Sequence, residues 1–190
     1  MAAGKLERVA RGVYSLPGRR LSERRSLAEA ALFVPQGVIR LSSALRVHEV
    51  GTQAPFEVWM AIPQNAPAPR VDQPSLRITR MSGLALVEGI ETRRIDGVKV
   101  PIFNAEKTVA DGFKFRDKIG LDVALEALRG GWSRGLLSMD ELTRHAAIDR
   151  VANVMRPYVE SVVSPELAML YTAVRSLSWR LTMPHSVVAR

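Results

Sequence analysis

Residues 90–104 read IETRRIDGVKVPIFN, and this stretch decides the fold class of the chain. Two strand-like runs, 90–95 and 98–103, flank Asp96-Gly97, whose residue types accept the positive φ angles of a type I′ hairpin turn. Asn104 has the residue type of a helix N-cap, and apolar residues at helical spacing follow it. A hairpin that leads directly into a helix predicts an α+β fold.

The residues before this hairpin predict two helices and the rest of a small antiparallel sheet. Apolar residues at helical spacing indicate one helix that Ser22 caps and Pro35 ends, and a second helix over residues 41–48. Residues 56–62 and 76–81 have strand composition. Four prolines lie between these strands, so we expect an irregular surface loop there.

The residues after the hairpin predict a helical C-terminal lobe. The first helix runs from Asn104 to Phe115, and a leucine repeat indicates a second over residues 121–132. Ser138-Met-Asp-Glu141 matches a capping box at the start of a third helix. An apolar stripe over residues 151–162 indicates a fourth, which Pro157 is expected to kink or split.

The composition is typical of a globular chain of about one domain. Of its 190 residues, 47% are hydrophobic and 24% are charged. No apolar run approaches the roughly 18 residues that cross a bilayer, and no signal-peptide pattern is visible, so we expect a cytoplasmic protein without a membrane partner. The absence of cysteine excludes a disulfide scaffold, a thiolate zinc site and a cysteine nucleophile.

The net charge of +8 is concentrated at the front of the chain. Residues 1–25 carry seven bases and two acids, a net charge of +5, whereas the remainder carries 20 bases and 17 acids, a net charge of +3. This pattern is typical of a polyanion-binding element attached to another domain, and equally of a solvated basic terminus.

Residues 5–18 predict two short strands folded into a ribbon around Gly12, with Arg8 and Arg11 near its tip. In a winged helix, such a ribbon lies over the phosphate backbone, where bases release counterions and give salt-sensitive affinity with little sequence preference. The candidate DNA-binding residues are Lys5, Arg8, Arg11, Arg19, Arg20, Arg24 and Arg25.

A search for catalytic residues finds no metal-ligand spacing, no cofactor motif and no nucleophile motif. His48, His145 and His185 lie far apart and are each expected at the surface or at the edge of the core. No phosphate-binding loop is present, and no Gly-x-Ser-x-Gly motif is present. We therefore expect neither an enzyme nor a bound cofactor or metal.

A metal-dependent nuclease remains a weaker alternative, because such an enzyme needs clustered carboxylates and a lysine. Glu88 and Glu91 with Lys99 could be read in this way, although the acid, x, lysine order on one strand is missing. The other carboxylates near the hairpin and the following helix are Asp96, Glu106 and Asp111.

A second basic cluster could indicate nucleic-acid stacking, because its bases lie among aromatic residues. We instead interpret Phe113 as core, and Lys114, Arg116 and Lys118 as a solvated rim near the end of the helix. The cluster consists of Lys107, Lys114, Arg116 and Lys118.

Several segments resemble a known family. Residues 6–17, LERVARGVYSLP, resemble the wing that closes the N-terminal winged helix of AbiEi-type antitoxins, the regulators of type IV toxin–antitoxin systems. Further segments resemble the C-terminal part of the same family: 58–63 (VWMAIP), 103–111 (FNAEKTVAD), 113–116 (FKFR), 118–128 (KIGLDVALEAL) and 154–158 (VMRPY).

The resemblance implies a protein with two roles and no enzymatic activity. One role is binding promoter DNA and repressing its own operon, and the other is neutralising a cognate nucleotidyltransferase-type toxin, directly or indirectly. The alternative is an antitoxin or interaction module without autonomous DNA binding. The candidates for the antitoxicity surface are Arg93, Arg94, Lys114, Arg116 and Lys118.

The resemblance also implies a domain organisation. Residues 1–20 are expected to be the wing remnant of a winged helix-turn-helix, residues 21–163 an AbiEi-like antitoxin domain, and residues 164–190 a tail of unknown role. The family's recognition helix precedes the wing, and only four residues precede Lys5 here, so we expect an N-terminally shortened member.

Overall fold

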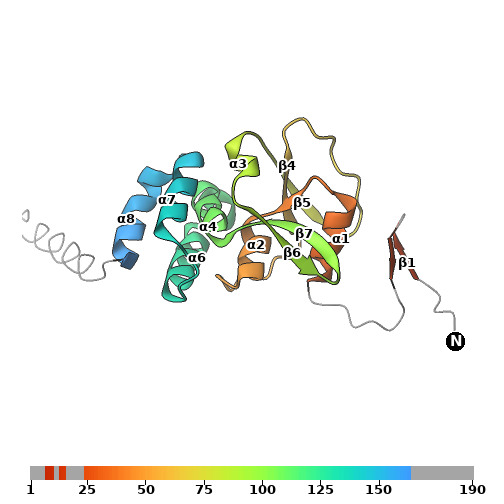
Figure 1. Cartoon of the computed structure of the whole chain (residues 1–190), viewed down its shortest axis with the longest axis horizontal. Coiled ribbons are helices and arrows are strands. Elements are labelled where there is room, and N and C mark those ends of the chain that lie inside the picture. Colours follow the sequence, from red (N-terminus) through yellow and green to blue (C-terminus); the bar gives the residue numbers. More distant parts are fainter. Residues whose placement is uncertain (1–6, 11–12, 16–23, 164–190) are drawn as a thin grey trace, which may run out of the picture.

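A five-stranded sheet and a group of helices beside it make up most of the structure, a computed structural model that describes residues 7–10, 13–15 and 24–163 (Figure 1). The helices α4, α6, α7 and α8 gather on one side, and the sheet lies on the other. The predicted α+β class is confirmed. None of the helices in the described part of the chain is long and apolar enough to cross a membrane.

The sheet is mixed, so the prediction of an antiparallel sheet is wrong. Its strand order is β5-β4-β3-β7-β6, and the pairs β4–β5 and β3–β7 are parallel. The proline-rich loop after Pro63 is the crossover connection that parallel neighbours require. The strands are β3 (Val38–Ile39), β4 (Val58–Pro63), β5 (Leu76–Met81), β6 (Ile90–Ile95) and β7 (Val98–Phe103).

The hairpin that decides the fold class forms as predicted. Strands β6 and β7 pair antiparallel with Ile95 opposite Val98, which leaves Asp96 and Gly97 as the two turn residues. Their φ angles are 50° and 87°, as a type I′ turn requires.

Each face of the sheet is covered by a different helix. Helix α1 (Arg25–Phe33) packs Leu27, Ala30 and other small apolar residues against one face, where they meet Met60 and Ile102. The short helix α3 (Leu84–Val87), which the sequence does not predict, covers part of the other face around Phe103. The side of the sheet that faces α1 is therefore packed more completely than the side that faces α3.

The helical lobe has its own core, to which Phe113 and Leu128 belong. Asn104 caps α4 as predicted, because its side chain accepts a hydrogen bond from the Lys107 backbone N–H. Ser138 precedes α7 but forms no side-chain cap. The remaining helices are α2 (Leu41–His48), α4 (Ala105–Lys114), α5 (Arg116–Ile119), α6 (Leu121–Ser133), α7 (Met139–Ile148) and α8 (Ala152–Val163).

Two end regions of the sequence carry predictions of their own. Strands β1 (Glu7–Ala10) and β2 (Val13–Ser15) pair antiparallel, as predicted for the ribbon, with Arg8 opposite Tyr14 in the register. Their assignment as a wing stays a prediction. Of the two outcomes expected at Pro157, the split does not occur, since α8 runs through this residue, and the kink stays a prediction. Several predicted features lie outside the described residues: the Ser22 cap, Lys5, Arg11, Arg19, Arg20, His185 and the tail 164–190.

Candidate functional site

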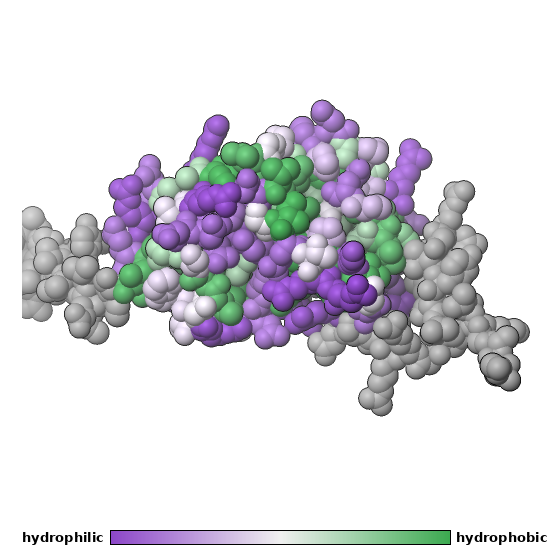
Figure 2. Space-filling model, in the orientation of Figure 1, coloured by the Kyte–Doolittle hydropathy of each residue, from purple (hydrophilic) through white to green (hydrophobic). Residues whose placement is uncertain are grey.

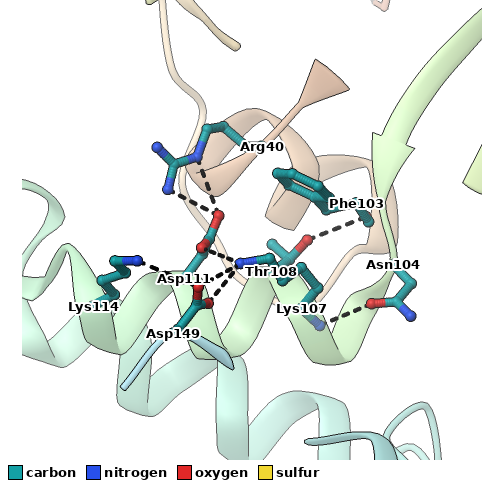
Figure 3. A network of polar contacts seen from close by, with 8 residues as sticks. All are labelled: Arg40, Phe103, Asn104, Lys107, Thr108, Asp111, Lys114 and Asp149. Carbon is teal, nitrogen blue, oxygen red and sulfur yellow. Dashed lines mark hydrogen bonds and ion pairs between the residues drawn. The ribbon is translucent and has the colours of Figure 1, made fainter. Parts of the chain in front are cut away.

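Four charged side chains meet inside the molecule, where the sheet joins the helical lobe (Figure 3). Arg40 lies between β3 and α2, Lys107 and Asp111 lie one turn apart on α4, and Asp149 follows α7. Asp149 is 3% exposed and the other three are fully buried. Charged residues are seldom fully buried unless each is paired with an opposite charge. The contacts among these four side chains show whether their charges are paired.

Lys107 is the centre of this cluster. Its ammonium donates to Asp111 Oδ1 at 2.8 Å and to both carboxylate oxygens of Asp149, at 2.7 and 2.6 Å. Arg40 donates from Nε and Nη2 to Asp111 Oδ2, at 3.1 and 2.9 Å. Lys114, which is partly exposed, lies 3.4 Å from Asp149 Oδ1. The two positive charges of Arg40 and Lys107 therefore balance the two negative charges of the buried carboxylates.

The two carboxylates differ in proton affinity. Burial and the neighbouring charge of Asp111 raise the pKa of Asp149 to about 6, even though Lys107 opposes the shift. Burial also acts to raise the pKa of Asp111, but Arg40 and Lys107 outweigh it and hold that pKa below its ordinary value. Asp111 is therefore the permanent anion of the cluster, and Asp149 is the group that can take up a proton near neutral pH.

This geometry joins parts of the fold that are distant in sequence. Arg40 ties the sheet to α4, and Lys107 ties α4 to the end of α7. The Arg40 guanidinium also lies 4.1 Å from the Phe115 ring centroid, a cation–π distance. Lys107, which the sequence groups with the second basic cluster, is fully buried in this network, and Phe113 is fully buried as predicted. The i, i+4 spacing of Lys107 and Asp111 was the one sequence signal of their pairing.

The carboxylates considered for a nuclease are dispersed. Glu88 pairs with Arg144, Glu91 pairs with Arg93, and Glu106 accepts from the Ser138 backbone N–H. Asp111 is occupied by Arg40 and Lys107. Over the described residues, no three His, Asp or Glu side chains are placed to hold a metal ion.

His145 is fully buried, which sequence analysis missed. Neither ring nitrogen has a hydrogen-bond partner among the described residues, although Nε2 lies 3.5 Å from Glu141 Oε2. Gly89, at φ 74°, packs so closely that a Cβ there would lie 2.8 Å from His145 Cε1. Burial, and then the charge of Lys107, lower the pKa of His145 below 6.5.

The lowered pKa of His145 predicts a pH-dependent contribution to stability. The unfolded chain binds the imidazole proton more tightly than the folded chain, so stability falls as the pH drops below 6.5. The raised pKa of Asp149 has the opposite effect on stability. This effect is the same in a His145→Gln variant, so it cancels when the two proteins are compared. We expect the stability of the wild type relative to H145Q to fall by about 1 kcal/mol between pH 7.5 and 5.5 in urea titrations. A constant difference would contradict the buried neutral imidazole.

Two of the candidate DNA-binding residues already have acidic partners. Arg24 Nη2 lies 3.2 Å from Glu49 Oε1, and Arg25 Nε lies 2.6 Å from Glu29 Oε1. Both arginine side chains remain more than a third exposed, and such surface ion pairs contribute little. These pairs therefore leave both arginines accessible to a phosphate that competes with the carboxylate.

The antitoxicity candidates occupy two regions. Arg93 and Arg94 lie on β6, whereas the three other candidates lie at the end of α4 and on α5. Lys114 contacts Asp149, Arg116 donates to the Phe113 carbonyl, and Lys118 lies 5.6 Å from the Phe115 ring centroid. An open hollow of about 420 Å³ instead brings together Arg24 and Arg93, one from each predicted set.

The sequence matches no protein-family model and no curated protein at a significant level. The resemblance of its segments and the geometry described above are therefore the basis of a functional proposal.

Proposed function

We propose that this chain is an antitoxin of a type IV toxin–antitoxin system that also binds promoter DNA and represses its own operon. Its target in this proposal is a nucleotidyltransferase-type toxin, and it acts in the cytoplasm by binding alone. The DNA-binding part of this proposal is supported by the antiparallel pairing of β1 and β2 within the most basic part of the chain. A two-stranded basic ribbon suits contact with phosphates.

The antitoxin half is supported by the positions of the family-like segments. The segment FNAEKTVAD supplies the Asn104 cap and the buried pair Lys107 and Asp111. The later segments supply α6 and part of α8, which share one core with α4. These residues hold the scaffold together, so recognition of a toxin falls to the surface that the scaffold presents.

Charge reversal at the ribbon tests the DNA-binding half. We expect Arg8→Glu with Arg11→Glu to weaken binding to the chain's own promoter, because two phosphate contacts are replaced by repulsion. The slope of log affinity against log salt should fall by about 2, roughly one for each lost contact. Fluorescence anisotropy with promoter duplex between about 50 and 200 mM salt measures both quantities.

A matched control separates this effect from a change in net charge. Arg70→Glu with Arg129→Glu reverses two exposed charges on the body of the protein and should leave the slope unchanged. If the two double variants behave alike, the ribbon is not the DNA contact. Equal wild-type affinity for promoter and random duplex would favour the alternative, an antitoxin or interaction module without autonomous sequence-specific binding.

A further inference from the structure

The side chain of Phe56, in the loop between α2 and β4, is 92% exposed. It is the most exposed large hydrophobic residue in the described part of the chain. Leaving a phenylalanine ring in water forgoes the burial that normally stabilises a fold. One exposed apolar residue is ordinary by itself, so the groups around Phe56 decide whether it belongs to a binding site.

Phe56 lines an open hollow of about 260 Å³ that also contains aromatic and cationic side chains. Trp59 and Arg77 lie opposite each other in the parallel pair β4–β5, and the Arg77 guanidinium lies 4.3 Å from the Trp59 ring centroid. This cation–π contact holds the guanidinium at the wall of the hollow. Lys118 lines the same hollow, and its ammonium forms no ion pair or hydrogen bond with a described residue.

A second, smaller hollow also has Phe56 in its lining, so two basic hollows adjoin at this ring. The second hollow adds Arg24 and Arg46. Among the described residues that line the two hollows, four are basic and one, Glu57, is acidic. Glu57 Oε2 lies 3.6 Å from Arg77 Nη1, and a partly exposed ion pair of this length contributes little. A phosphate can therefore compete for the Arg77 guanidinium.

A nucleobase with its neighbouring phosphates fits this combination of groups. Aromatic side chains and guanidinium groups stack on unpaired bases, and nearby cations balance the phosphates. In a duplex the faces of the bases are stacked on one another, so only a strand with exposed bases can use the Phe56 ring. A second copy of this chain fits poorly, since a two-fold contact would bring the basic hollows together.

We propose that the Phe56 site, defined as Phe56, Trp59, Arg77 and Lys118, binds single-stranded nucleic acid. One base stacks on Phe56, while Arg77 and Lys118 contact neighbouring phosphates. Trp59 is a positioning residue that holds Arg77. The site is built from the sheet, the loop before it and α5, not from the ribbon. The inference therefore goes beyond promoter binding and does not depend on it.

The test measures fluorescence anisotropy with labelled probes of about 12 nucleotides. Two are single strands, oligo(dU) and oligo(rU), which differ in the 2′-hydroxyl alone, and the third is a duplex of the same length. The variants of the site are Phe56→Ala, Phe56→Trp and Lys118→Gln. Each is measured in the wild-type full chain and in the full chain with Arg8→Glu and Arg11→Glu, so that binding by the ribbon does not mask the site.

Two control variants change matched exposed residues outside the site. Figure 2 shows hydrophobic surface over α3, where Leu84 is 60% exposed. Leu84→Ala truncates an aliphatic side chain that offers no stacking to a base. Arg129→Gln removes an exposed positive charge from α6. Thermal unfolding confirms that every variant folds.

We expect Phe56→Ala to weaken binding of the single strands by at least about fivefold, because it removes the stacking ring. Its salt dependence and its affinity for the duplex should not change, since no charge is lost. Phe56→Trp retains a ring and should bind at least as tightly as the wild type. Lys118→Gln should lower the slope of log affinity against log salt by about 0.7, the value for one phosphate of a single strand. Both controls should match the wild type.

Unchanged binding of the single strands by Phe56→Ala overturns the site, and so does an equal loss of duplex binding. Poly-glutamate that competes as well as unlabelled oligonucleotide assigns the hollow to acidic proteins and also overturns it. A preference for either single strand supports the site, and the tighter probe identifies RNA or DNA as the ligand. Promoter repression and growth rescue are measured separately, so the proposed function stands or fails independently of these outcomes.

Discussion

Replacing Lys107 with methionine lowers the free energy of unfolding by about 3–5 kcal/mol at pH 7.5. The substitution keeps the length and apolar stem of the side chain but removes the ammonium that contacts both buried carboxylates. Asp111 retains Arg40, while Asp149 is left with the partly exposed Lys114. Chemical denaturation of the full chain measures the loss.

The pH dependence of that loss identifies its electrostatic cause. Without Lys107, the folded-state pKa values of both carboxyls rise, that of Asp149 further above its value in the unfolded chain and that of Asp111 from its lowered position, so the folded variant binds protons more tightly. The variant therefore regains stability relative to the wild type as the pH falls from 7.5 to 5.5. Lys114→Met, a matched control at the rim, should cost less than about 1 kcal/mol. A K107M loss that does not change with pH would indicate packing rather than charge.

Replacing Phe113 with alanine lowers the free energy of unfolding by about 3–5 kcal/mol, because the ring is fully buried in the core of the helical lobe. The ring also packs against Tyr158, with 5.6 Å between centroids, so the substitution loses an aromatic contact between α4 and α8. Denaturant titration followed by circular dichroism measures the change.

Phe56→Ala is the matched control for this prediction. The Phe56 side chain is 92% exposed, and its truncation should change stability by no more than about 0.5 kcal/mol. If the two substitutions cost the same, the helical core is not organised around Phe113. If both are neutral, the packing described for α4, α6 and α8 is wrong.

Local sequence rules predict local features of this fold well. The Asp96-Gly97 turn and the Asn104 cap follow from preferences that act over two to four residues. The Ser138 side chain forms no capping hydrogen bond, although residues 138–141 match the capping-box pattern. Glu106, 32 residues away in sequence, provides an acceptor for the Ser138 backbone N–H, so the start of α7 is held by a tertiary contact.

Such local rules do not specify the order and direction of the strands in the sheet. Strand β3 has two residues, too few for any periodicity, yet it lies at the centre of the sheet. Its parallel pairing with β7 joins Ile39 to Ile102, a contact that no local pattern specifies. The other parallel pair, β4 and β5, consists of two predicted strands, and their relative direction depends on the path of the loop between them rather than on any local pattern.

The buried charges were missed for a related reason. Arg40 and Asp111 are 71 residues apart, and Lys107 and Asp149 are 42 apart, so each residue taken alone reads as a solvated charge. His145 was assigned to the surface or core edge on the same grounds. By contrast, Arg93 and Arg94 are both exposed although adjacent strand residues point to opposite faces, because β6 is the edge strand of the sheet.

We propose that the basic ribbon binds DNA and that the body of the protein neutralises the toxin. One strain that carries a reporter of the chain's own promoter and an inducible gene for the proposed nucleotidyltransferase-type toxin tests both halves together. With Arg8→Glu and Arg11→Glu in the full chain, the account predicts that repression of the reporter is lost while growth rescue equals that of the wild type. Loss of rescue together with repression, or repression that survives the charge reversal, would contradict it.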